Sequence, residues 1–389
     1  MSEIMYHPSS ERTTEEYIEL HNTGAVAVNL EGWKFTSGIS YTFPNVSLPA
    51  GGFLVVAANG AAFASKYPLV KNVVAGWTGQ LSNAADTVVL KDRSGVKVDE
   101  VAYADDGDWA SRERDEVDDG RRGWRWRSAA DGFGKSLELI HVGFDNSNGQ
   151  NWAASIAVDG TPGAPNSVAA ADLAPVVSRV RHFPLIPTPA QVVTVTAAVH
   201  DDQATTISVR VNYRRETATT WTTAPMFDDG AHDDGLAGDG VFGAQLPAEA
   251  ASTIVEFYVS ASDGSRTRTW PAPALNNANP GEPFVAEQSQ NCLYQVEGAP
   301  SAGAMPLYRL VMKSADRATL EQINLVSTSS HSRFNATFIT VDGTSSELRY
   351  LTSLRNRGHI SAGRQPQSFN LGIPNNWEWK GRTELNFNS

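Results

Sequence analysis

The chain has 389 residues, of which 41% are hydrophobic, a length that suits roughly two or three folded domains. Its formal net charge of −12 argues against nucleic acid as the main partner. There is no run of about 18 apolar residues that could span a membrane, and a single cysteine, Cys292, excludes a disulfide within the chain.

The charge is unevenly distributed. Residues 305–389 carry ten Lys and Arg against six Asp and Glu, a net charge of +4, whereas the remainder of the chain is acidic. The sequence opens directly on a strand-like segment, without the basic start and apolar run of a signal peptide. We therefore expect it to be a fragment of a longer exported protein whose leader lies upstream.

Short apolar stretches separated by Gly, Pro, Asn and Asp occupy residues 1–166, a pattern typical of β-strands joined by turns. The continuous apolar run of residues 53–58 predicts a strand that is buried on both faces. Residues 61–67 predict a short helix, which Pro68 ends because proline cannot continue it.

Several motifs in this region resemble, in order, those of a lamin-tail domain, the immunoglobulin-like module of nuclear lamins and of many bacterial secreted proteins. The motifs are EIMYHP at residues 3–8, EYIEL at 16–20, LEGW at 30–33, PAGGFLVVA at 49–57 and GTPGAPN at 160–166. The resemblance implies that residues 1–166 form an immunoglobulin-like sandwich that binds a partner or acts as a spacer between other domains.

One segment departs from that family, because residues 104–131 are longer and more charged than the family usually has there. The segment contains a cluster of tryptophans and arginines: Arg121, Arg122, Trp124, Arg125, Trp126 and Arg127. Both residue types are favoured at binding hot spots, so one interpretation is a loop that grips a partner. The alternative is a loop folded over the edge of the sandwich, with its tryptophan buried and its arginines solvated.

An Ala-rich linker, residues 167–175, precedes a second region that is again all β. Residues 192–199 are rich in β-branched side chains, and residues 254–261 alternate between apolar and polar ones. Strand spacing of this kind over about 110 residues predicts an immunoglobulin- or fibronectin-like sandwich, here over residues 176–287. It resembles the bacterial surface modules that often follow lamin-tail domains.

The pattern changes after a connector of residues 288–304. A predicted strand, a helix that begins after Ser314 and a pair of strands follow, at residues 307–312, 315–326, 334–341 and 348–355. This order resembles the start of a CotH domain, the spore-coat-kinase-like family. The matching segments are Tyr308–Met312, Phe334–Phe338, Asp342-Gly343, Leu354–Gly358 and Leu385–Ser389.

The resemblance implies that residues 305–389 are the N-terminal part of a CotH-like domain. The expected fold class is therefore mainly β, with two immunoglobulin-like β-sandwiches in series and a truncated α+β segment.

A Gly-rich loop at residues 227–242 carries five aspartates, Asp228, Asp229, Asp233, Asp234 and Asp239. Calcium prefers carboxylate oxygens on a flexible loop, so these residues are candidate ligands of a Ca²⁺ ion, although their spacing is not that of an EF-hand. The alternative is a solvated turn in which the aspartates accept hydrogen bonds from backbone N–H groups.

Four residues of the CotH-like segment are candidate cofactor-binding residues: Arg355, Arg357, Gly358 and Arg364. A phosphoryl-transfer site needs cations near the phosphates and carboxylates for Mg²⁺. The resemblance implies Mg-ATP as the cofactor only if the domain is complete and active, because the family's metal-binding carboxylates lie beyond residue 389. The alternative is that the arginines are ordinary solvated or ion-paired strand residues.

We therefore expect a fragment of a bacterial secreted or cell-surface protein of the lamin-tail and CotH type. Its sandwiches would act in adhesion, binding or spacing, with a protein or a cell-surface or cell-wall component as partner. The alternative is a CotH-like ATP-dependent protein kinase whose catalytic half is missing from this chain. A third interpretation, carbohydrate binding, rests only on aromatic side chains such as Trp124, Trp126, Trp377 and Trp379.

Overall fold

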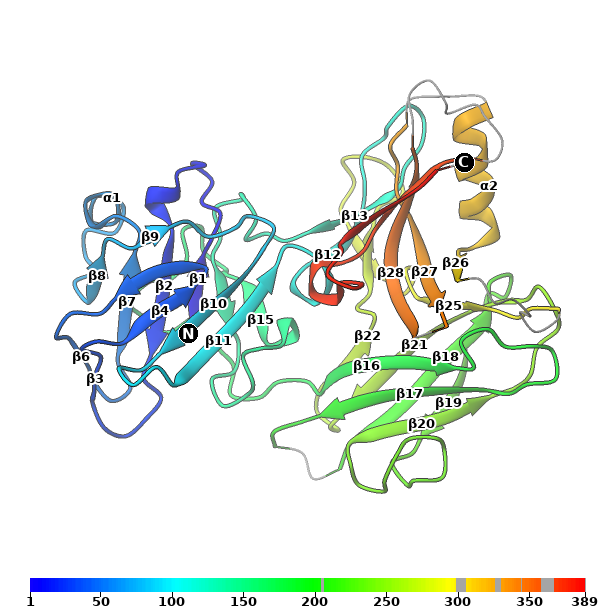
Figure 1. Cartoon of the computed structure of the whole chain (residues 1–389), viewed down its shortest axis with the longest axis horizontal. Coiled ribbons are helices and arrows are strands. Elements are labelled where there is room, and N and C mark those ends of the chain that lie inside the picture. The colour runs from blue at the N-terminus through cyan, green and yellow to red at the C-terminus, as the bar shows by residue number, and fades with distance from the viewer. Residues whose placement is uncertain (204–205, 299–305, 326–329, 344, 358–366, 389) are drawn as a thin grey trace. The chain divides into compact units, whose positions relative to one another are not determined.

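The computed structural model of the protein describes residues 1–203, 206–298, 306–325, 330–343, 345–357 and 367–388. The fold is mainly β, which confirms the expected fold class. The chain forms two compact units (Figure 1): residues 1–111 with 126–173, and residues 112–125 with 174–389. Among the described residues, no helix is both long and apolar enough to cross a membrane.

The first unit contains two antiparallel sheets with one parallel pair at an edge. The six-stranded sheet runs in the order β15 (Trp152–Ala154), β14 (Leu137–Leu139), β1 (Glu3–Met5), β2 (Tyr17–His21), β7 (Phe53–Ala57) and β8 (Val73–Ala75). The five-stranded sheet runs β11 (Lys97–Ala104), β10 (Ala85–Lys91), β4 (Lys34–Ser37), β5 (Ile39–Thr42) and β9 (Thr78–Gly79). Two short strands, β3 (Val28–Asn29) and β6 (Ser47–Leu48), form a separate antiparallel pair.

The core of this unit lies between the two sheets, as in an immunoglobulin-like sandwich. Ile18 and Val56 of the larger sheet pack with Phe35 and Val88 of the smaller one in a single buried cluster. Helix α1 (Gly60–Lys66) covers the other face of the larger sheet through Phe63. It begins at Asn59, whose side chain accepts hydrogen bonds from two backbone N–H groups, and it ends one residue before the expected position.

The second unit contains the second sandwich. One of its sheets is β16 (Val176–Phe183), β17 (Val193–His200) and β20 (Val241–Leu246). The other is β19 (Thr222–Met226), β18 (Ser208–Arg215), β21 (Ile254–Ser262) and β22 (Thr267–Trp270), with β25 (Cys292–Gln295) also paired to β21. A further four-stranded sheet runs β13 (Trp124–Arg127), β12 (Ser111–Arg114), β23 (Ala274–Asn276) and β24 (Val285–Glu287).

The C-terminal part of this unit is one antiparallel sheet with a helix. Its strands run in chain order as β26 (Leu307–Val311), β27 (Phe334–Val341), β28 (Ser346–Asn356), β29 (Phe369–Gly372) and β30 (Glu384–Phe387). Helix α2 (Ser314–Leu325) follows β26, so the predicted strand–helix–strand–strand order is confirmed.

The alternation of side chains along β27 explains how this sheet is packed on both faces. Phe334, Ala336 and Phe338 join Leu320 of α2 in one buried cluster. Ile339 points to the opposite face and packs with Ile254 and Leu293 of the second sandwich. The sandwich and the C-terminal sheet therefore share a core within one unit, while the boundaries predicted for the individual domains stay predictions.

Candidate functional site

The aspartate loop connects β19 to β20, and its carboxylates bond to the loop's own backbone. Asp234, 2% exposed, accepts hydrogen bonds of 2.8–3.0 Å from the N–H groups of Asp229, Gly230 and His232. Asp228 accepts bonds of 2.7–3.2 Å from the N–H groups of Gly238, Asp239 and Gly240. Asp239 in turn accepts from those of Leu236 and Val241.

The other two aspartates accept hydrogen bonds from side chains. His232 Nδ1 lies 2.9 Å from Asp229 Oδ1, and this contact, with the Ala231 N–H group, lowers the pKa of Asp229. Asp233 accepts a bond of 2.9 Å from the Thr194 hydroxyl. Burial acts to raise the pKa of Asp234, but its three backbone N–H donors hold that pKa below its usual range.

This geometry fits a self-capped turn better than a calcium site. Backbone N–H dipoles point their positive ends at the carboxylate oxygens that a cation would need. In the part of the chain that the structure describes, no group of three or more His, Cys, Asp or Glu side chains is arranged to hold a metal ion. The calcium site stays a prediction, and the geometry supports the turn that the sequence left as its alternative.

The candidate cofactor residues lie at the end of β28. Arg355 Nη1 is 3.3 Å from His331 Nδ1, and Arg357 donates to the side chain of Asn388. Gly358 and Arg364 lie outside the described residues. The structure adds Arg333, which sequence reasoning missed because it precedes a different strand.

Arg333 donates to the Asn370 amide oxygen at 2.7 Å and to the Ser353 hydroxyl at 3.3 Å. Burial and the nearby Arg355 guanidinium lower the pKa of Arg333. Arg333 directly precedes Phe334, which pairs with Leu354, so Arg333 and Arg355 lie on neighbouring strands; the nearby Glu384 carboxylate acts to raise the pKa of Arg333.

The charged segment of residues 112–125, here called the arm, packs within the second unit. Strand β12 pairs in parallel with β23, and Arg122 donates to the backbone oxygen and side-chain oxygen of Asn277 at 3.0 and 2.6 Å. Trp124 is buried, with the Arg114 guanidinium 5.0 Å from its ring centre. The expectation of a buried tryptophan holds, whereas Arg122 is bonded to protein rather than only solvated.

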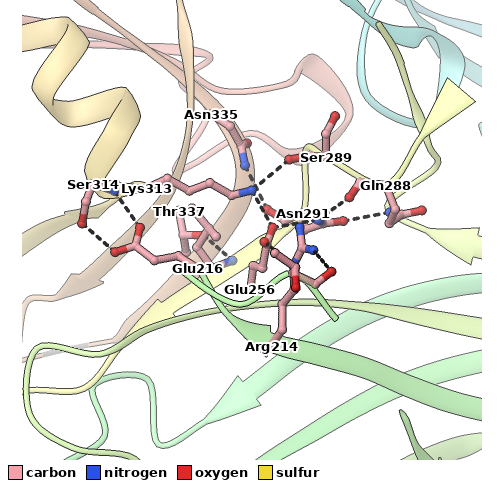
Figure 2. Close-up of polar contacts among 12 residues, drawn as sticks. Arg214, Glu216, Glu256, Gln288, Ser289, Asn291, Lys313, Ser314, Asn335 and Thr337 are labelled. Carbon is pink, nitrogen blue, oxygen red and sulfur yellow. Dashed lines mark hydrogen bonds and ion pairs between the residues drawn. The ribbon is translucent and has the colours of Figure 1, made fainter. Parts of the chain in front are cut away.

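A buried ion cluster joins the second sandwich to the C-terminal sheet (Figure 2). Its centre is Glu256 of β21, whose side chain is fully buried. Arg214 Nε approaches one carboxylate oxygen at 2.7 Å, and Lys313 Nζ approaches the other at 2.6 Å. The Asn291 amide donates to the second oxygen at 2.9 Å. Two cations and an amide therefore compensate the loss of water around one carboxylate.

Amide side chains extend this cluster toward the C-terminal sheet. Asn335 of β27 donates to the backbone oxygen of Asn291 at 2.9 Å, and the Thr337 hydroxyl accepts from the Leu293 N–H group at 3.2 Å. At the start of α2, Glu216 accepts hydrogen bonds from the Ser314 N–H group and hydroxyl at 2.7 and 2.6 Å. A carboxylate at this position stabilises the helix N-terminus.

Sequence reasoning did not single out Glu256. The residue stands in an alternating strand between Val255 and Phe257, where an outward-facing glutamate is ordinary. Its partners Asn291 and Lys313 come from segments that are distant in sequence. A glutamate on the polar face of a strand can therefore be recognised as buried only when the segments that pack on that face are known.

If the loop is the self-capped turn, calcium should leave the thermal unfolding midpoint unchanged, because backbone N–H groups already bond to the loop carboxylates. The measurement is the melting temperature of the chain in chelator and in millimolar Ca²⁺, since a ligand that binds only the folded state raises it. An increase that the Asp233→Asn, Asp239→Asn double variant abolishes would restore the calcium site.

Replacing Glu256 with alanine is predicted to destabilise the second unit by about 2–3 kcal/mol, because two half-buried cations lose their carboxylate partner and Asn291 loses an acceptor. The measurement is urea unfolding followed by circular dichroism. Glu249→Ala is the matched control: it removes the partner of the exposed Arg215, so its predicted cost is below about 1 kcal/mol. Equal costs for the two variants would refute this role of Glu256.

Comparison with known proteins finds two segments of the chain that match family models. Residues 1–105 match the model of the Lamin Tail Domain family, and residues 188–259 match that of the conditioned medium factor second Ig-like domain. No curated protein matches the chain. A marsupial T cell receptor structure aligns at 9% identity over 95% of this chain and 97% of its own, with a TM-score of 0.19, too low to support an argument. Two segments of this chain are thus similar to immunoglobulin-like families.

Proposed function

We propose that the chain is part of a bacterial secreted or cell-surface protein that acts by binding through its immunoglobulin-like sandwiches. Support comes from the two family matches and from the mainly β architecture. Immunoglobulin-like domains commonly mediate protein interactions. The proposed partner is a protein or a component of the cell surface or cell wall.

The observation that carries this proposal is the form of the aspartate loop. Its carboxylate caps fix the backbone, while Leu236 is 76% exposed and Phe227 is 45% exposed. A loop that a rigid sandwich holds in one conformation loses little entropy on binding. Exposed apolar side chains on such a loop supply contact area for a partner. The acidic rim disfavours nucleic acid as that partner.

A second candidate function is phosphate binding in a CotH-like kinase, and one observation favours it. Arg333 and Arg355 lie close together on the C-terminal sheet, where their charges would stabilise phosphate oxygens. The CotH resemblance itself rests on the sequence motifs alone. Calorimetric titration with Mg-ATP separates the candidates, since heat that Arg355→Ala abolishes would favour the kinase.

For the binding function, the chain is predicted to co-sediment with intact bacterial cells or with purified cell-wall sacculi. Leu236→Asp should weaken this association at least about tenfold, because a hot-spot side chain would be lost. Val285→Asp is the matched control: it alters a 65%-exposed valine elsewhere in the same unit and should bind normally. Absence of co-sedimentation, or an equal loss in both variants, would contradict the proposal.

A further inference from the structure

Three glutamates occupy adjacent positions across the larger sheet of the first unit. The strand register places Glu3 of β1 opposite Glu138 of β14 on one side and opposite Glu19 of β2 on the other. All three are fully buried. Directly opposed residues in a sheet lie about 5 Å apart, so the carboxyl groups form a row on one face.

The row bonds to the segment that closes this domain, residues 160–168. Thr161 donates its N–H group to Glu3 at 2.9 Å and its hydroxyl to Glu138 at 2.7 Å. The Gly163 N–H group donates to Glu19 at 2.6 Å. Ser167 and Val168 donate to the second oxygen of Glu138 at 2.7 and 3.1 Å. The three glutamates together therefore hold one stretch of chain.

The fit between row and segment is close at Gly160. A Cβ atom there would lie 2.1 Å from Glu3 Oε1 and 2.3 Å from the Tyr17 hydroxyl, and the residue has a φ of +75°. Glycine is therefore required both by the space and by the backbone conformation. Movement of the glutamates would be transmitted directly to this segment.

The groups that donate hydrogen bonds to these three glutamates are hydroxyl and N–H groups. Glu256, in contrast, pairs with two cations. Tyr17 and Ser136 donate to Glu3 Oε1 at 2.6 and 2.5 Å, while the buried Oε2 atom has no hydrogen-bond partner. Burial, reinforced by the neighbouring glutamates, raises the pKa of Glu3 to about 7 and that of Glu19 to about 8.

The other titratable groups that face the row, Tyr17, Tyr67 and Lys66, each have a hydrogen-bond or ion-pair partner. The Tyr17 hydroxyl bonds to Glu3, and the Tyr67 hydroxyl donates to the backbone oxygen of Asp159 at 2.8 Å. Lys66 of α1 bonds to Glu15 and Asp159 at 3.0 and 2.7 Å, so its charge is already compensated. Burial and the nearby carboxylates hold the pKa of both tyrosines above their usual range.

We propose that Glu3, Glu19 and Glu138 form a clasp on residues 160–168 that depends on the protons of Glu3 and Glu19. It is closed when these two neighbouring carboxyl groups are protonated and loosened when they ionise together and repel one another. Protons stabilise the closed form because unfolded glutamates release them near pH 4.5, whereas Glu3 and Glu19 retain them to about 7 and 8. The clasp therefore weakens as the pH rises through this range. It lies immediately before residues 169–175, which lead to the second unit.

Amide hydrogen exchange of the full chain tests the clasp, with rates corrected for intrinsic exchange. Between about pH 6 and about pH 9, the protection of the Gly163 and Val168 amides should fall at least about tenfold in the natural protein. Glu19→Gln keeps an oxygen that accepts from Gly163 but cannot ionise, so its fall should be below about threefold. Glu31→Gln, on an exposed glutamate of the same unit, should behave like the natural protein.

Two results would overturn the proposal. One is an equal fall of protection at Gly163 and Val168 in the natural protein and in Glu19→Gln. The other is a parallel fall at the amides of β2 and β7, which would mean that the whole sheet opens rather than the segment. A second variant, Glu3→Gln, guards against misfolding of the first, because its remaining oxygen keeps the three donors described for Oε1.

Discussion

The second unit depends on one electrostatic requirement: a carboxylate that is removed from water must be given cations and hydrogen-bond donors. Glu256 receives Arg214 from β18, Lys313 from the segment before α2, and the Asn291 amide. These partners come from both the sandwich and the C-terminal part of the chain. Lys313, two residues after β26, thereby ties the C-terminal part to the sandwich, in addition to the apolar contacts of Ile339 with Ile254 and Leu293.

The first unit meets the same requirement differently. Glu3, Glu19 and Glu138 are as deeply buried as Glu256, but hydroxyl and N–H groups donate to them in place of cations. Burial raises the pKa of Glu3 and that of Glu19, because the ionised form of each lacks a counter-charge. One residue type is thus compensated by cations in one unit and by neutral donors in the other. The aspartate loop between β19 and β20 shows a third solution, in which carboxylates cap the loop's own backbone.

The sequence predicted what depends on local pattern. Pro68 predicted the end of the helix near residues 61–67, and a helical pattern after a capping residue predicted the helix after Ser314. Both helices are present within one residue of the expected limits. The alternation of residues 254–261 predicted strand β21, whereas the aspartate-rich composition of residues 227–242 left a calcium site and a turn as alternatives. These features are set by neighbours in the chain, so the chain alone was sufficient.

Features that join distant segments could not be predicted in this way. Nothing near Arg122 indicated that it would bond to Asn277, and nothing near Arg333 indicated Asn370 or Arg355 as neighbours. Glu138 lies more than a hundred residues after Glu3 and Glu19 in the sequence. Only the pairing of their strands places the three glutamates side by side. Each case requires knowledge of which strands pair, which the local pattern does not contain.

The most direct test of this account is native-state hydrogen exchange of the second unit in increasing denaturant. Because Glu256 and its partners join the sandwich to the C-terminal sheet, the slowest amides of β21 and β27 should reach the same free energy of opening. That result would show that the two parts unfold together. If the amides of β27 opened at a distinctly lower free energy than those of β21, the C-terminal sheet would be an independent attachment and the account would be contradicted.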